Sequence, residues 1–70
     1  MFGKRLRATR LSRGMTQEKL SEAAGVALRT YQAYEQGTRR PSFEILVKLA
    51  DLLSVSTDYL LGRGIQTEDM

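Results

Sequence analysis

The 70-residue sequence contains no cysteine and no histidine, and it has a single proline. Without cysteine the chain has no disulfides, no thiol chemistry and no thiolate metal sites, which is compatible with a reducing cytosol. Without histidine it lacks the commonest general base and transition-metal ligand. The sequence also has no phosphate-cradling glycine loop. We therefore expect no cofactor, no metal site and no enzymatic activity.

Long apolar runs are missing as well. No stretch approaches the roughly 20 residues needed to cross a bilayer. The start, "MFGKRLRATR", carries charges but no following apolar region, so it does not have the pattern of a secretory signal. We expect a cytoplasmic protein with one domain at most, whose small core leaves little room for an enclosed pocket.

Positive charge is in modest excess, with a formal net charge of +3 and a sequence pI of about 9.7. The placement of this charge is more informative than its amount. Clustered basic residues favour a polyanionic partner, either nucleic acid or an anionic membrane surface, and charge alone does not choose between them. The clusters are Lys4, Arg5, Arg7, Arg10 and Arg13 in the first segment, and Arg39 and Arg40 in a later loop.

Apolar spacing predicts five helical segments and no strand, and hence an all-α fold. Gly14, Gly25, Gly37 and Gly62 end four of the five segments, and helix starts are suited to capping by Thr16, Ser42 and Ser56. Counting the capping residues, we expect helices at about 3–13, 16–24, 28–36, 42–53 and 56–61. Residues 1–62 would form the domain, and the aperiodic 63–70 would be a flexible tail or the start of a linker.

The helical periodicity also predicts which side chains face the core. Arg10 falls inside the apolar arc of the first segment, four residues after Leu6. It therefore either pairs with a carboxylate or extends to solvent, because an unpaired buried charge is very costly. The expected inward residues include Phe2, Leu6, Leu11, Leu20, Ala23, Ala24, Tyr31, Tyr34, Phe43, Leu46, Leu49, Ala50, Leu53 and Leu60.

The second and third segments are two short helices joined by a glycine-containing turn, which is the pattern of a helix-turn-helix. In that motif the second helix lies in the DNA major groove. Tyr31 and Tyr34 share one face of the third segment with Glu35. The opposite face carries Arg29, Gln32, Ala33 and Gln36, spaced i, i+3, i+4, i+7.

Three stretches in the right order, "LR..R...GMTQEKLSEAAGV", "YQAYEQGTRRPS" and "LVKLADLLSVSTDYLLG", resemble the XRE-type, Cro and lambda-repressor-like helix-turn-helix domains. The resemblance covers roughly Leu6 to Gly62. It implies a compact five-helix bundle that binds a double-stranded operator DNA, usually as a homodimer. The implied function is a sequence-specific transcriptional regulator, expected to be a repressor.

The resemblance also implies roles for individual residues. Glu35 matches the glutamate that pairs with an arginine at the position of Arg10, and Gln17 matches a residue that holds a phosphate at the start of the second helix. Arg29 can donate two hydrogen bonds to guanine, and Gln32 can form two hydrogen bonds with adenine. Leu28 and Ala33 offer apolar contact to a thymine methyl. Arg39 and Arg40 match a loop that touches the DNA backbone, where they would attract phosphates independently of sequence.

One position departs from the family. Many members have Ser or Thr where this chain has Ala27, and that hydroxyl caps the third helix and often meets a phosphate. Alanine can do neither, at a cost of about 1 kcal/mol for the missing cap. The backbone N–H groups at the helix start remain able to bind a phosphate.

Other functions use the same residues differently. An antitoxin-like or anti-repressor protein-interaction module would have the same fold without needing Arg29 or Gln32. Membrane-surface binding through the first helix would need Leu6 and Leu11, which the core requires. If the chain dimerises, the surplus apolar residues late in the sequence are the candidate contacts, although each could instead pack in the core: Ile45, Leu52, Tyr59, Leu61 and Ile65.

Overall fold

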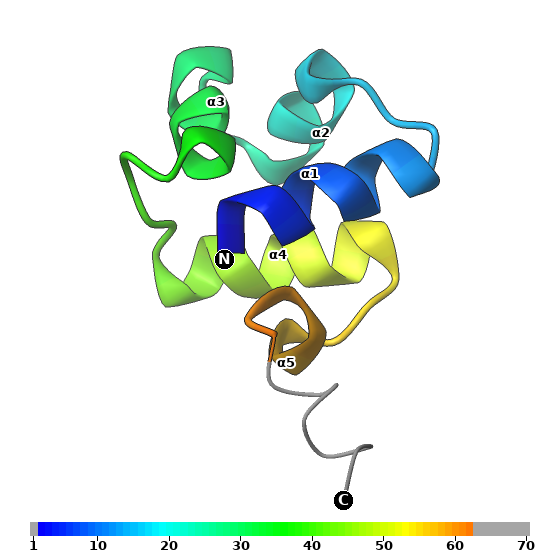
Figure 1. Cartoon of the computed structure of the whole chain (residues 1–70). Helices are drawn as coiled ribbons and strands as arrows, with labels where there is room; N and C mark the ends of the chain where they lie inside the picture. Colours follow the sequence, from blue (N-terminus) through cyan, green and yellow to red (C-terminus); the bar gives the residue numbers. More distant parts are fainter. Residues whose placement is uncertain (1, 63–70) are drawn as a thin grey trace, which may run out of the picture.

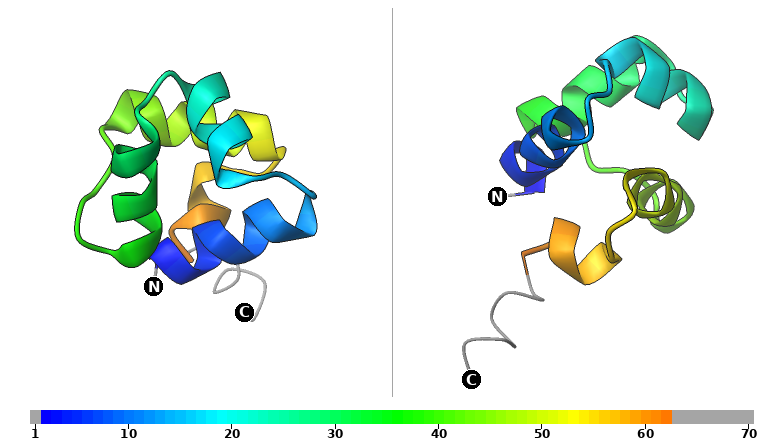
Figure 2. Two further views of the ribbon diagram at one scale, coloured as in Figure 1. Left: turned by 90° about the horizontal axis from the view of Figure 1, so that it is seen from above. Right: turned by 90° about the vertical axis from the view of Figure 1, so that its right-hand side faces the viewer.

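The computed structural model describes residues 2–62, and within this range it consists of five α-helices (Figure 1). α2 and α3 lie side by side at one end of the molecule and α5 lies at the other, with α1 and α4 between them (Figures 1 and 2). This is the all-α, five-helix architecture that the sequence predicts. The helices are α1 (Phe2–Ser12), α2 (Gln17–Ala24), α3 (Leu28–Gln36), α4 (Phe43–Leu53) and α5 (Thr57–Leu60).

Side chains and glycine together set the helix ends where the sequence predicts them. Thr16, Ser42 and Ser56 each accept a hydrogen bond from the backbone N–H three residues further on, at 3.1, 3.2 and 3.0 Å. Gly25 ends α2 with φ 78°, a left-handed conformation that glycine adopts without a Cβ clash. α1 begins at Phe2 and ends at Ser12, so each end lies one residue earlier than predicted.

The core draws large side chains from all five helices. Tyr31 of α3 is fully buried and lies among leucines that are equally inaccessible to solvent. Burying one side chain of this size contributes about 1.5–3 kcal/mol. Those leucines are Leu6, Leu20, Leu49, Leu53 and Leu60, with Ala24, Tyr34 and Ala50 completing the buried apolar set.

Three residues that we predicted to face inward do not. Leu11 is 56% exposed, because α1 turns Leu6 and Arg10 toward the core and Leu11 lies about 100° further round the helix. Phe43 is 76% exposed, because it is the first residue of α4 and helical side chains lean toward the N-terminus. Ala23 is exposed, since α2 packs through Leu20, Ser21 and Ala24 instead.

α1 approaches the end of α3 so closely that only glycine fits at the contact. A Cβ on Gly3 would lie 2.4 Å from the backbone oxygen of Glu35 and 2.9 Å from that of Tyr34. Gly3 therefore lets α1 lie against the α3 backbone, and this packing helps to set the orientation of α3. Within residues 2–62, no helix combines the length and the apolar character that crossing a membrane requires.

The predicted tail, residues 63–70, lies outside the described residues, and so does the candidate dimer contact Ile65. Of the remaining late apolar residues, Ile45 is half-buried and packs against the core. Leu52 and Tyr59 are both 38% exposed, and Leu61 is 47% exposed. Exposed apolar side chains therefore remain on α4 and α5.

Candidate nucleic-acid interface

α3 presents one polar face to solvent because its other face is anchored by two tyrosines. Tyr31 and Tyr34 are buried, and their rings meet edge to face with centroids 6.2 Å apart. Arg29 lies on the opposite side and is exposed, while Gln32 and Ala33 are half-buried. Leu28, at the start of the helix, is also half-buried, and Gln36, at its end, is exposed.

The start of α3 has no side-chain cap. Ala27 has the extended backbone of an N-cap residue, with φ −65° and ψ 148°, but makes no capping hydrogen bond. The backbone N–H groups of the first helical turn have no partner within the helix itself. Together with the positive end of the helix dipole, such groups can bind an anion.

Beneath this face, Arg10 of α1 and Glu35 of α3 form a buried ion pair, the pairing that the family resemblance implies. Arg10 Nε donates to Glu35 Oε2 at 2.7 Å and a second guanidinium nitrogen donates to Oε1 at 3.3 Å. The side chains are only 8% and 5% exposed. Arg10 also donates to the backbone oxygen of Met15 at 2.9 Å, so the pair ties α1 to both α3 and the turn before α2.

Glu35 is the acceptor for two further side chains. Gln17 Nε2 donates to Oε1 at 3.0 Å, and the Tyr31 hydroxyl donates to Oε2. Burial opposes ionisation of Glu35, but the hydrogen bonds from Arg10, Tyr31 and Gln17 outweigh it and hold the pKa of Glu35 below its ordinary value. Burial and the Glu35 carboxylate raise the pKa of Tyr31, which therefore remains a hydroxyl donor.

Gln17 links this buried cluster to the outer face of α3. Its Oε1 accepts a hydrogen bond from Gln32 Nε2 at 3.3 Å, so both ends of the Gln17 amide are engaged. The i, i+4 spacing of Tyr31 and Glu35 could have indicated their contact from the sequence. The Gln17 contacts carry no local signal, because Gln17 belongs to a different helix.

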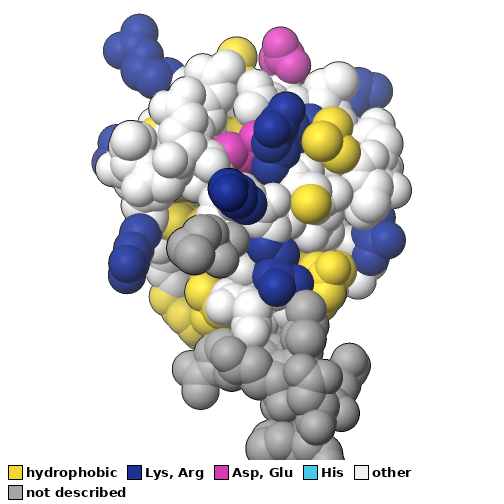
Figure 3. Space-filling model, viewed as in Figure 1, with side chains coloured by type: hydrophobic (Ala, Val, Ile, Leu, Met, Phe, Trp, Pro, Cys, Tyr) yellow, Lys and Arg dark blue, Asp and Glu magenta, His cyan; other side chains and the backbone are white. Residues whose placement is uncertain are grey.

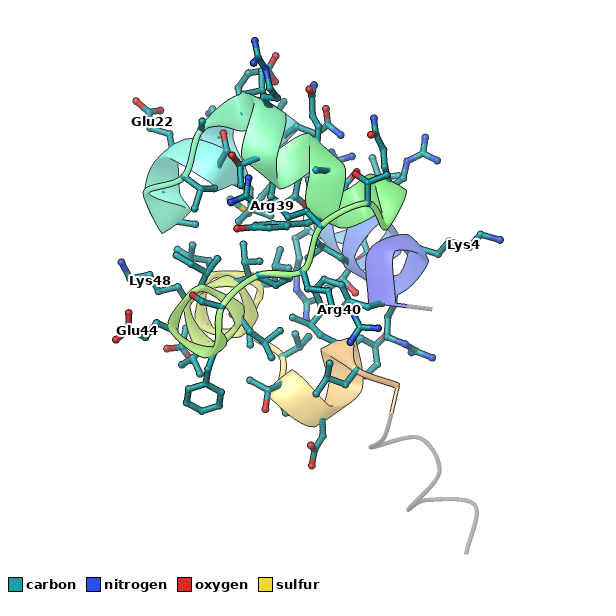
Figure 4. All side chains as sticks on the ribbon, turned by 90° about the vertical axis from the view of Figure 1, so that its left-hand side faces the viewer. Lys4, Glu22, Arg39, Arg40, Glu44 and Lys48 are labelled. Carbon is teal, nitrogen blue, oxygen red and sulfur yellow. The ribbon has the colours of Figure 1, made fainter. Side chains whose placement is uncertain are left out.

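Arg39 and Arg40 project from the connection between α3 and α4, and both are exposed (Figure 4). With Lys4 of α1 they line a surface hollow of about 320 Å³ beside Gly37, where α3 ends. Lys4 belongs to the N-terminal basic cluster, and the fold brings it to this hollow from a position 35 residues before Arg39. Other Lys and Arg side chains are scattered over the face that α1 occupies rather than gathered at one point (Figure 3).

A family model described as helix-turn-helix matches residues 6–60 of the chain. Among curated proteins, the chain is 41% identical over 61 residues to the SPbeta prophage-derived uncharacterized HTH-type transcriptional regulator YonR of Bacillus subtilis (strain 168). That match covers 87% of this chain and 56% of YonR. The chain spans a little over half the length of curated relatives of this kind.

Solved structures agree with this match. The structure of the P22 c2 repressor in complex with a synthetic operator has a TM-score of 0.84 and 32% identity, and the match covers 90% of this chain and 96% of the chain in that structure. SinR, described as the master regulator for biofilm formation and solved with DNA, has a TM-score of 0.81 and 34% identity, covering 87% and 98%. From the order of its helices, the contacts of α2 and α3, and these matches, we conclude that the chain belongs to the helix-turn-helix family.

Proposed function

We propose that this protein is a sequence-specific regulator of transcription, of the repressor type, that binds double-stranded DNA and reads the major groove with α3. The observation that carries the proposal is the polar face of Arg29 and Gln32, held outward by the burial of Tyr31 and Tyr34 behind it. A single α-helix fits into the major groove of B-DNA, where every base pair presents a distinct pattern of hydrogen-bonding groups. The P22 c2 repressor seen with an operator, and SinR seen with DNA, support this ligand.

Four residues of α3 and three basic residues beside it would have distinct chemical roles in such a complex. Arg29 would donate two hydrogen bonds to O6 and N7 of a guanine, and Gln32 would pair with N6 and N7 of an adenine. Ala33 and Leu28 would contact thymine methyl groups on either side. Arg39 and Arg40, together with Lys4, would neutralise phosphates beside the groove, which makes affinity strongly dependent on salt.

We further propose that the protein acts as a homodimer in the cytoplasm, on an operator with two-fold symmetry. A single module of this size buries only about 600–1,000 Å² on DNA, which favours pairing for specific recognition. The exposed side chains of Leu52, Tyr59 and Leu61 supply apolar surface for a second copy. Two copies of α3 about 34 Å apart would read half-sites one helical turn apart.

Selection of bound sequences from random duplex DNA tests the proposal. We expect the wild-type chain to enrich one operator, and Arg29→Ala to lose about 1–3 kcal/mol of discrimination at one base pair of each half-site. Arg7→Ala is the matched control, because it removes the same charge from an exposed position on α1. If Arg29→Ala and Arg7→Ala enrich the same operator with equal stringency, α3 does not read bases through Arg29.

A further inference from the structure

A chain of hydrogen bonds runs from the buried Glu35 carboxylate to the outer face of α3. Glu35 Oε1 accepts from Gln17 Nε2 at 3.0 Å, and Gln17 Oε1 accepts from Gln32 Nε2 at 3.3 Å. Glu35 and Gln32 belong to α3, whereas Gln17 is the first residue of α2. These hydrogen bonds therefore connect α3 to the neighbouring helix α2 and lead back to α3, at the face proposed to meet DNA.

In both of these hydrogen bonds the donor must lie on the side away from Glu35, because the buried Glu35 carboxylate can accept a hydrogen bond but cannot donate one. Arg10 holds Glu35 as a carboxylate through two hydrogen bonds, and an ionised carboxylate has no proton to give. Gln17 must turn its NH₂ group toward Glu35, which leaves its carbonyl oxygen facing Gln32. Gln32 must in turn offer its NH₂ group to Gln17. Both amides thus have a single favoured orientation.

We propose that Gln17 is a positioning residue that sets which way the Gln32 amide faces, and through it the base that α3 prefers. The proposal rests on the proposed function. In the orientation seen, Gln32 retains its carbonyl oxygen and one N–H, which match the N6 donor and N7 acceptor of adenine. In the reverse orientation, the Gln32 oxygen would accept a hydrogen bond from Gln17. The two N–H donors of Gln32 would then remain for the base, and they match O6 and N7 of guanine. Gln17 and Glu35 therefore favour adenine over guanine.

This role differs from the phosphate contact that the family resemblance implies for Gln17. In the structure both ends of its amide are already engaged within the protein. A side chain that is ordered before binding loses less entropy when the complex forms. Gln32 would accordingly meet the base in a prepared orientation, with the buried ion pair as the fixed point of the arrangement.

Binding to a library that varies each base pair of the selected operator tests the proposal. Gln17→Met keeps the length of the side chain and removes both hydrogen bonds. We expect the wild type to prefer adenine over guanine by about tenfold at the pair that Gln32→Ala identifies. Gln17→Met should reduce that preference to about twofold or less, and adding it to Gln32→Ala should change that position no further. Gln36→Met, the same substitution at an exposed position on α3, should leave that position unchanged.

A different result separates the two roles of Gln17. If Gln17→Met weakens binding to every sequence by one common factor and keeps the adenine preference, Gln17 holds a phosphate and the proposal is overturned. A wild-type chain that enriches no sequence would overturn the proposed function itself.

A measurement without DNA tests the positioning independently. In ¹⁵N relaxation of the free protein, the Gln32 side-chain amide should be more ordered than that of Gln36 in the wild type. In Gln17→Met the two amides should be equally mobile. Equal mobility of the two amides already in the wild type would overturn the proposal whatever the DNA result.

Discussion

At the scale of single residues, the buried carboxylate of Glu35 is the point where polar side chains from α1, α2 and α3 meet. Its side chain is 5% exposed and receives hydrogen bonds from Arg10, Gln17 and Tyr31, which come from three different helices. A buried pair of this kind is not strong evidence of net stabilisation against an apolar replacement, but removing one partner leaves an uncompensated charge. We therefore expect the cluster to be sensitive to single substitutions.

Glu35→Gln should lower the free energy of unfolding by about 3 kcal/mol at neutral pH, because Arg10 remains buried without its counter-ion. Urea denaturation followed by circular dichroism measures this difference. Glu44→Gln is a suitable control, since it removes the same charge from an exposed position on α4. An unfolding free energy within about 0.5 kcal/mol of the wild type would show that the pair does not hold α1 against α3.

The same variant should change how stability depends on pH. Because the pKa of Glu35 is lower in the folded protein than its ordinary value of 4.5, the unfolded chain binds more protons in this range. The contribution of Glu35 is therefore complete above about pH 4.5 and is lost as the pH falls through the folded pKa. The difference in melting temperature between wild type and Glu35→Gln should shrink on acidification. A difference that stays constant down to pH 3 would contradict this assignment.

At the scale of helices, α3 is positioned by backbone contact as well as by side chains. α1 lies against its C-terminal end through Gly3, and α2, which precedes α3, packs beside it across the turn at Gly25. Among the helices whose N-cap residue is described, α2 to α5, only α3 has no side-chain cap, since Ala27 occupies its N-cap position. We therefore expect an added methyl group at Gly3 to destabilise the protein and an added hydroxyl group at Ala27 to stabilise it.

Gly3→Ala should destabilise the protein although alanine is the better helix former. The added Cβ would lie 2.4 Å from the Glu35 backbone oxygen, so α1 has to move away from α3. We expect a loss of about 1–3 kcal/mol in the free energy of unfolding, as for overpacked cores. Ala8→Gly, at an exposed position of α1, should lose about 1 kcal/mol through helix propensity alone. Equal or greater stability of Gly3→Ala would show that α1 and α3 tolerate separation.

Ala27→Ser should stabilise the protein by about 0.5–1 kcal/mol, because the backbone there already has the conformation in which a hydroxyl caps the helix. Thermal denaturation measures the gain. Ser42→Ala, which removes the existing cap of α4, should cause a loss of similar size. If only Ser42→Ala changes stability, the first turn of α3 gains nothing from a cap.

At the scale of the whole molecule, the proposed DNA face and the remaining apolar surface belong to different parts of the fold. Arg29 and Gln32 lie on α3 at one end, whereas Tyr59 and Leu61 lie on and just after α5, at the other end (Figure 1). A second copy could therefore bind through α5 without covering the polar face of α3.

Leu61→Glu should convert the proposed dimer into monomers, since a charge would then lie in an apolar contact between the copies. Sedimentation equilibrium measures the change in mass. Leu11→Glu is the control, because Leu11 is similarly exposed but lies on α1. A wild-type chain that stays monomeric at high concentration, or dimerises as well with Leu61→Glu, would remove α5 from the interface.

Local chemistry was sufficient to predict the five helices, because caps and glycines act within a few residues of where they stand. The bounds of α3 and α4, the capping roles of Thr16, Ser42 and Ser56, and the burial of both tyrosines all follow from neighbours along the chain. Periodicity also placed Arg29 and Gln32 opposite those tyrosines.

Only the tertiary structure decided which side of each helix meets another helix, and how closely. Periodicity did not separate Leu11 from Leu6, and nothing near Gly3 indicates that α3 passes directly above it. The hydrogen bonds that join Gln17 to Glu35 and to Gln32 connect residues 18 and 15 positions apart. Contacts of this kind depend on where separate helices come to rest, which the packing of the whole core determines and no single segment encodes.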